Sequence, residues 1–129
     1  HELKRNLALN GLRDERVHAI ALGNEEHTVL MTTKERSSNH VSDKGDLSVA
    51  MVRLDDFATA NALPDPDWIK IDIEGYELPA LQGAESLLRR SQPVIIAEIN
   101  HLHDRAGTSL FDLLSYLKGL GYTPYRLLE

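Results

Sequence analysis

The sequence predicts an α/β domain with a mainly parallel β-sheet and an antiparallel hairpin attached to it. Two nearly continuous apolar runs, residues 68–73 and 94–99, are typical of strands buried inside a parallel sheet. A segment with helical spacing separates them, as expected of a right-handed crossover between parallel strands. Two further strands, 28–33 and 48–54, have no helix between them, which predicts the hairpin. All of residues 1–129 fit one domain.

The chain begins with the signals of a helix followed by a strand. Leu3 and Leu7 lie on one face of the helix expected over residues 2–10, and Asn10-Gly11 is a stop signal. The apolar run 17–22 then predicts a short strand that precedes the hairpin.

Polar segments divide the middle of the chain. The stretch 34–46 is rich in Ser, Asn, Asp and Gly, which predicts a long loop within the hairpin. Either Asp55 or Asp56 is expected to cap a short helix that ends at Ala62. The turn 64–67, with two Pro and two Asp residues, then leads into the strand at Trp68.

The second half predicts two helical regions, a strand between them and a final strand. A helix is expected after Gly75, broken or bent at Gly83. Ser109 and Asp112 have the spacing of a capping box, and an apolar face with a period of 3.6 follows them. Residues 122–128 are expected to form the last strand. The two apolar faces consist of Leu81, Ala84, Leu87 and Leu88, and of Leu110, Leu113, Leu114 and Leu117.

Composition restricts the partners and the compartment. The net charge is -6 and no basic stripe is present, which argues against nucleic acid as a partner. The chain has no cysteine, so it has no disulfide, thiolate metal site or cysteine nucleophile, and it fits a reducing compartment such as the cytoplasm. No apolar run approaches the roughly 20 residues that span a bilayer.

Acidic residues near the ends of the two apolar strands are the candidate site. Asp72 and Glu98 each lie near the carboxyl end of a strand, and Glu74 follows Asp72 closely. Ligands of open parallel sheets bind beyond the carboxyl ends of the strands. Such carboxylates orient a hydroxyl, act as a general base or hold a hard cation. In the structural alternative, Asp72 and Glu74 cap the next helix and Glu98 pairs with Lys70.

A metal site is a further alternative. Glu98, His101 and His103 carry the ligand types of metal centres, but their spacing matches no strong zinc pattern, and a solvated loop is favoured. A metal-dependent hydrolase built on Asp72, Glu98 and His101 is therefore kept as an alternative function. Lys70 alternates with Asp72 along its strand, which favours an ion pair between them.

The central motif resembles a known family. Residues 69–77 read Ile-Lys-Ile-Asp-Ile-Glu-Gly-Tyr-Glu, and Leu-Gln-Gly-Ala follows at 81–84. This run is similar to the signature of the FkbM-type methyltransferases, which are Rossmann-like and use S-adenosylmethionine. Weaker similarities, in the same order as in the family, lie at 6–10, 19–23, 54–56, 93–98 and 121–122.

The resemblance implies methyl transfer to a hydroxyl of a sugar, lipid or secondary metabolite. Asp72 would lie near the methyl donor and the accepting hydroxyl, and Glu74 and Glu98 would orient or deprotonate that hydroxyl. Ala21 and Leu22 would pack on the adenine. The acceptor pocket is expected to consist of the 34–46 loop, the segment after Glu98 and residues that are missing from this chain.

The family's glycine-rich first strand and the acidic residue after its second strand are absent. The resemblance therefore implies the carboxyl-terminal part of the domain, lacking the first two strands of the sheet. In the family these strands lie between the third and the fourth, so the strand at Trp68 would expose an unpaired edge. We expect weak cofactor binding by this chain and possible self-association into a homo-oligomer. A non-catalytic interaction fragment or pseudoenzyme is the other alternative.

Overall fold

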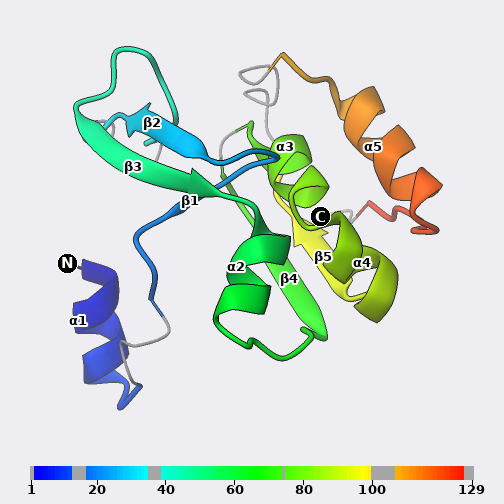
Figure 1. Ribbon diagram of the computed structural model, residues 1–129, viewed down its shortest axis with the longest axis horizontal. Helices are drawn as coiled ribbons and strands as arrows, with labels where there is room; N and C mark the ends of the chain where they lie inside the picture. The colour runs from blue at the N-terminus through cyan, green and yellow to red at the C-terminus, as the bar shows by residue number, and fades with distance from the viewer. Residues whose placement is uncertain (1, 13–16, 35–38, 74, 100–106, 127–129) are drawn as a thin grey trace.

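A computed structural model describes residues 2–12, 17–34, 39–73, 75–99 and 107–126 (Figure 1). The chain is α/β, and its helices and strands lie close to the predicted positions. In order they are α1 (Glu2–Leu9), β1 (Ala21–Leu22), β2 (His27–Met31), β3 (Leu47–Val52), α2 (Leu54–Ala60), β4 (Trp68–Ile71), α3 (Glu77–Gln82), α4 (Glu85–Ser91), β5 (Val94–Ala97) and α5 (Leu110–Gly119).

The strands of the described chain form two small sheets instead of the single sheet that the sequence predicts. The hairpin sheet has the order β1-β3-β2, and the other sheet consists of β4 and β5. β1 runs parallel to β3, and β4 runs parallel to β5 with Trp68 opposite Val94. β1 and β4 each pair with a strand on one side only among the described residues. The expected unpaired edge at the Trp68 strand is therefore confirmed.

The predicted antiparallel hairpin is confirmed. β2 and β3 pair in antiparallel register, with Val29 opposite Val49. The chain beyond β2 returns along the other edge of that strand, where Val41 forms an antiparallel bridge with Met31. β2 therefore has backbone partners on both sides.

One face of the β4–β5 sheet forms the hydrophobic core. Helices α2, α3, α4 and α5 supply most of the buried side chains, and Leu81 and Leu88 are almost fully buried. Ile69 and Ile95 face these helices from the sheet. Alternate strand residues point to opposite faces, so this packing covers only half of each strand.

The opposite face of this sheet is open, which contradicts the expectation that both strands are buried on two sides. Trp68 is 64% exposed, Val94 is 50% exposed and Ile96 is 46% exposed. These apolar residues share one face of the parallel pair. No described element covers them, since the packed helices all lie on the other face.

The carboxyl-terminal region confirms one prediction and contradicts another. The capping box at the start of α5 is present: the Ser109 side chain accepts from the Asp112 backbone N–H, and the Asp112 carboxylate accepts from the Ser109 N–H. The expected last strand is wrong over residues 122–126, which form no strand. Tyr122 packs against the hydrophobic core instead, and Pro124 has no N–H to donate to a neighbouring strand, although β5 has an edge without a partner among the described strands. Residues 127–128 lie outside the described chain.

The predicted break at Gly83 separates α3 from α4 and brings two backbones into contact. A Cβ atom at Gly83 would overlap the carbonyl oxygen of Gly23, directly after β1. Glycine is required here because any side chain would push the helix junction away from the end of β1.

We predict that Gly83→Ala destabilises the protein by about 1–3 kcal/mol, because the added methyl group has backbone as its nearest neighbour. Gly119→Ala is the matched control, since a Cβ atom there meets nothing within 4 Å. It should leave stability unchanged or raise it by up to about 1 kcal/mol. Urea unfolding of both variants measures the difference, and equal stabilities would contradict the close contact.

Candidate functional site

A cavity of about 380 Å³ lies between the hairpin sheet and the β4–β5 sheet. This volume is within the usual range of ligand pockets, about 300–1,000 Å³. β1 and β4 both line the cavity, whereas β5 does not, so the cavity lies on the unpaired side of β4. The lining consists of Ile20, Ala21, Leu22, Met31, Asn39, His40, Val41, Leu54, Ile69, Lys70, Ile71, Asp72, Ile73, Tyr76, Ala80, Leu81 and Ala84.

The cavity brings together three of the residues singled out from the sequence. Ala21 and Leu22 line it from β1, and Asp72 lines it directly after β4. Glu98 is exposed and is not part of the lining, although its strand neighbours β4 as expected; its N–H donates to the Ile71 carbonyl over 3.0 Å. Glu74 lies outside the described residues.

Asp72 forms the ion pair that the alternation of residues predicts. Its Oδ2 atom lies 3.2 Å from the Lys70 Nζ atom, and both side chains reach solvent. An exposed pair of this kind contributes little to stability, at most about 1 kcal/mol. The Asp72 carboxylate can therefore exchange its lysine partner for a ligand at small cost.

The turn after Asp72 is held by a buried carboxylate to which the sequence analysis assigned no role. Glu77 is only 4% exposed, and its Oε1 atom accepts from the N–H groups of Gly75 and Ile73 over 3.2 and 3.4 Å. Buried carboxylates need such partners. Gly75 has φ 98°, the left-handed region that favours glycine. Glu77, two positions after Gly75, therefore stabilises the turn that follows Asp72.

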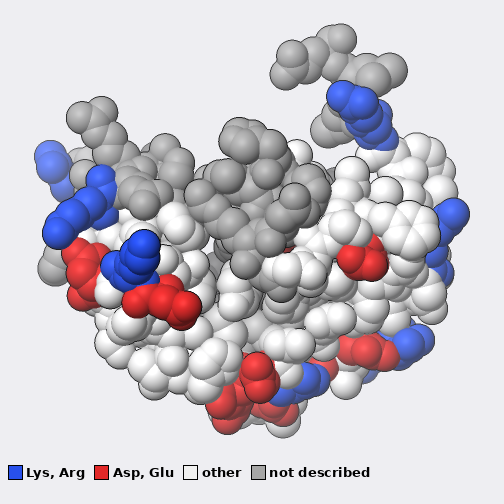
Figure 2. All heavy atoms as spheres, turned by 90° about the horizontal axis from the view of Figure 1, so that it is seen from above, with Lys and Arg blue, Asp and Glu red and all other residues white. Residues whose placement is uncertain are grey.

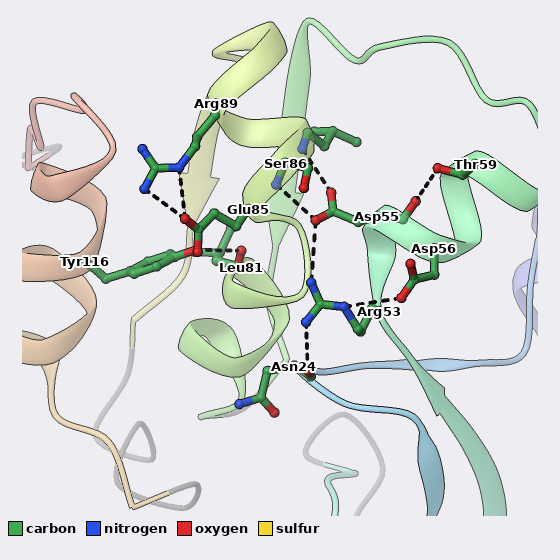
Figure 3. Close-up of polar contacts among 11 residues, drawn as sticks. Asn24, Arg53, Asp55, Asp56, Thr59, Leu81, Glu85, Ser86, Arg89 and Tyr116 are labelled. Atoms are coloured by element: carbon green, nitrogen blue, oxygen red, sulfur yellow. Dashed lines mark hydrogen bonds and ion pairs between the residues drawn. The ribbon is translucent and has the colours of Figure 1, made fainter.

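A second carboxylate joins the elements around the cavity, and it corrects an expectation. Neither Asp55 nor Asp56 caps α2, whose N-cap residue is Arg53 and has no side-chain cap. The Asp55 carboxylate instead accepts from the backbone N–H groups of Ser86 and Leu87, both over 2.9 Å (Figure 3). It therefore caps the start of α4, a helix about thirty positions further along the chain.

Arg53 extends this arrangement to the end of β1. Its guanidinium pairs with Asp55 over 3.6 Å and with Asp56 over 3.2 Å, and it donates to the Asn24 carbonyl over 2.8 Å (Figure 3). We call Arg53, Asp55 and their backbone partners the Asp55 clamp. It holds the chain after β1 against α2 and α4. Leu54 at the start of α2 and Ala84 directly before α4 form part of the cavity wall.

Two further cavity residues, His40 and Tyr76, were not among the predicted site residues. His40 lines the cavity from residues 39–46, the segment after β2 that we call the arm, and Tyr76 lines it from the turn after Asp72. The sequence gives His40 no distinguishing signal, because its place depends on how the arm folds back along β2. Tyr76 belongs to the central motif, and its position directly after Gly75 is the signal that could have identified it.

The metal alternative finds no support in the part of the chain that is described. Among those residues, no group of three or more His, Asp and Glu side chains could hold a metal ion. His101 and His103 lie outside the described residues. No helix within the described ranges is long and apolar enough to cross a membrane.

Comparison with known families decides the classification. The methyltransferase FkbM domain matches residues 1–124, nearly the whole chain. The chain belongs to the FkbM methyltransferase family. Its central motif, the cavity lining of β1 and the acidic residue after β4 are therefore parts of a methyltransferase domain.

One curated relative is the hexuronic acid methyltransferase AglP of Haloferax volcanii, which is 29% identical over 59 residues. The match covers 46% of this chain and 25% of the relative, so the chain spans about a quarter of the curated relative that it matches. No solved structure gives a significant match.

We predict that Asp55→Ala lowers the free energy of unfolding by about 1–2 kcal/mol, because two backbone N–H groups at the start of α4 lose their acceptor. Asp56→Ala is the matched control, because Asp56 is more exposed and its side chain forms an ion pair with Arg53. It should change stability by less than about 0.5 kcal/mol. Thermal unfolding of both variants makes the comparison. Equal losses would show that the clamp contributes no more than a surface ion pair.

Proposed function

We propose that this chain is part of an S-adenosylmethionine-dependent methyltransferase that methylates a hydroxyl group of a sugar. The observation that carries the proposal is the cavity in which Ala21, Leu22 and Asp72 meet at the carboxyl ends of β1 and β4. Family membership supports methyl transfer. The name of the relative, a hexuronic acid methyltransferase, supports a sugar acceptor.

The cavity residues fit the two parts of the cofactor. Leu22 and Ala21 offer apolar contact to an adenine ring. Asp72 offers a carboxylate at the polar rim, next to the cationic Lys70. Gly23 and Gly83 lie close together, and neither has a side chain that could fill the space at this end of β1.

S-adenosylmethionine, when bound, would supply an electrophilic methyl group that passes to the acceptor oxygen as the C–S bond breaks toward sulfur, which would leave S-adenosylhomocysteine. The residues of the chain align the hydroxyl and take its proton. We assign proton acceptance to Asp72, and orientation of the hydroxyl to Glu74, which lies two positions after Asp72 in the sequence. Glu98 follows β5 and lines neither the cavity nor its neighbouring hollow, so it has no contact with the hydroxyl in this proposal.

The two separate sheets support a further part of the proposal. β1 and β4 both have unpaired edges among the described residues, and the cavity lies between them. Much of its lining is apolar and includes Ile20, Leu54 and Leu81. We infer that two further strands of the methyltransferase sheet pair there in the whole protein. The cofactor would then lie at the carboxyl rim.

Surface charge supports a small acceptor. Among the described residues on the face shown in Figure 2, most basic side chains lie near acidic ones, and they form no large basic patch. Together with the net charge of -6, this favours a free or glycan-linked sugar over nucleic acid. The absence of cysteine favours the cytoplasm as the compartment.

Asp72→Asn in the full-length protein should reduce methyl transfer at least about a hundredfold, because the amide cannot accept the hydroxyl proton. Binding of S-adenosylhomocysteine, measured by calorimetry, should largely persist. Asp67→Asn makes the same chemical change at the other end of β4, where the residue does not line the cavity, and should leave transfer unchanged. Transfer is measured with radiolabelled cofactor and methyl glucuronide. Near-normal turnover by Asp72→Asn would remove Asp72 from the mechanism.

A further inference from the structure

A second hollow, also of about 380 Å³, lies beside the cavity. His40, Val41, Ser42 and Asp43 line it from the arm beyond β2, and Tyr76 lines it from the turn after β4. Four of these five side chains are polar. The proposed cofactor contacts, Ala21 and Leu22, are not part of it.

The arm that forms this hollow is fixed to β2 by backbone hydrogen bonds. The Thr32 N–H donates to the His40 carbonyl over 3.0 Å, and the Ser42 N–H donates to the Leu30 carbonyl over 2.9 Å. The His40 N–H also donates to the Thr32 hydroxyl over 3.1 Å. A pre-formed wall of this kind binds a ligand without first losing the entropy of a free loop.

Close packing at the base of the arm restricts it further. A Cβ atom at Gly45 would lie 2.6 Å from the Met31 backbone nitrogen, so the arm passes directly against β2. The Asp46 N–H donates to the Met31 carbonyl over 3.0 Å, and the Asp46 carboxylate accepts from the Thr33 hydroxyl over 2.8 Å. The Thr33 hydroxyl holds the pKa of Asp46 below its ordinary value, which keeps this carboxylate charged.

The hollow and the cavity share a wall. His40, Val41 and Tyr76 line both, while Asp72 lies only on the cavity side. A molecule in the hollow could therefore direct one of its groups past His40 and Tyr76 toward Asp72. Methyl transfer requires the acceptor hydroxyl to reach the methyl donor in line with the bond that breaks, so an acceptor site must open toward Asp72, as this hollow does.

The side chains of the hollow match a sugar ring. Hydroxyl groups both donate and accept hydrogen bonds, and the imidazole of His40 and the hydroxyl of Ser42 can do the same. The Asp43 carboxylate accepts from sugar hydroxyls, and the Tyr76 ring offers an apolar face with a polar tip. We propose that this hollow binds the methyl acceptor, a pyranose ring, with His40 and Tyr76 as its contacts on the side nearest Asp72.

His40→Ala in the full-length protein tests this directly. It should raise the KM for methyl glucuronide roughly five- to tenfold, the effect of one lost hydrogen bond, with little change in kcat or in S-adenosylhomocysteine affinity. His27→Ala is the matched control, because His27 is an exposed residue of β2 that lines neither space. Asp43→Asn provides a second variant that keeps the size of the side chain.

Because the inference rests on the proposed function, a binding measurement accompanies the kinetics. Methyl glucuronide and methyl glucoside are titrated into the wild-type protein, with S-adenosylhomocysteine present, and amide resonances are followed by NMR. Shifts at residues 40–43 and 76 are expected. Shifts confined to other residues, or an unchanged KM in both variants, would overturn the acceptor site and leave the methyltransferase intact. If the wild type neither bound S-adenosylhomocysteine nor transferred methyl groups, the proposed function would be contradicted. The resonance shifts caused by the sugars would still show whether the hollow binds a pyranose ring.

Discussion

The contact between Gly83 and the carbonyl of Gly23 determines how the two sheets of this chain are placed. No described strand joins the hairpin sheet to the β4–β5 sheet, so their relation depends on helices and on backbone contacts. The α3–α4 junction lies directly against the end of β1. The Asp55 clamp fixes the same junction, since a carboxylate that accepts from backbone N–H groups forms stronger hydrogen bonds than a neutral acceptor.

The cavity and its chemistry follow from this placement. With β1 held against the helix junction, its last residues and the turn after β4 face one space. The buried Glu77 carboxylate accepts from the Gly75 N–H and so stabilises that turn. The backbone next to Asp72 is therefore held in place, while the Asp72 side chain reaches solvent. Asp55 and Glu77 accept hydrogen bonds from backbone N–H groups and stabilise the fold. The Asp72 carboxylate, in contrast, can exchange its Lys70 partner for a ligand.

Local patterns in the sequence predicted most of the helices and strands, and tertiary contacts account for the rest. The capping box at Ser109 and the helix break at Gly83 depend on residues that are close in the sequence, and both predictions are confirmed. The role of Asp55 could not be predicted, because its partners lie about thirty residues away. The site was predicted in part: the motif identified Asp72, whereas His40 enters the cavity only because the arm folds back along β2. The open face at Trp68 depends on which elements cover the sheet, and strand periodicity does not contain that information.

Hydrogen exchange of the full-length protein with and without S-adenosylhomocysteine tests the central claim most directly, that the carboxyl ends of β1 and β4 form part of the cofactor site. The account predicts slower exchange at residues 20–23 and 71–76 on binding, with no change at the exposed end of α4. Binding that protects other segments and leaves these unchanged would contradict the account. The same conclusion would follow if the folded protein bound no S-adenosylhomocysteine.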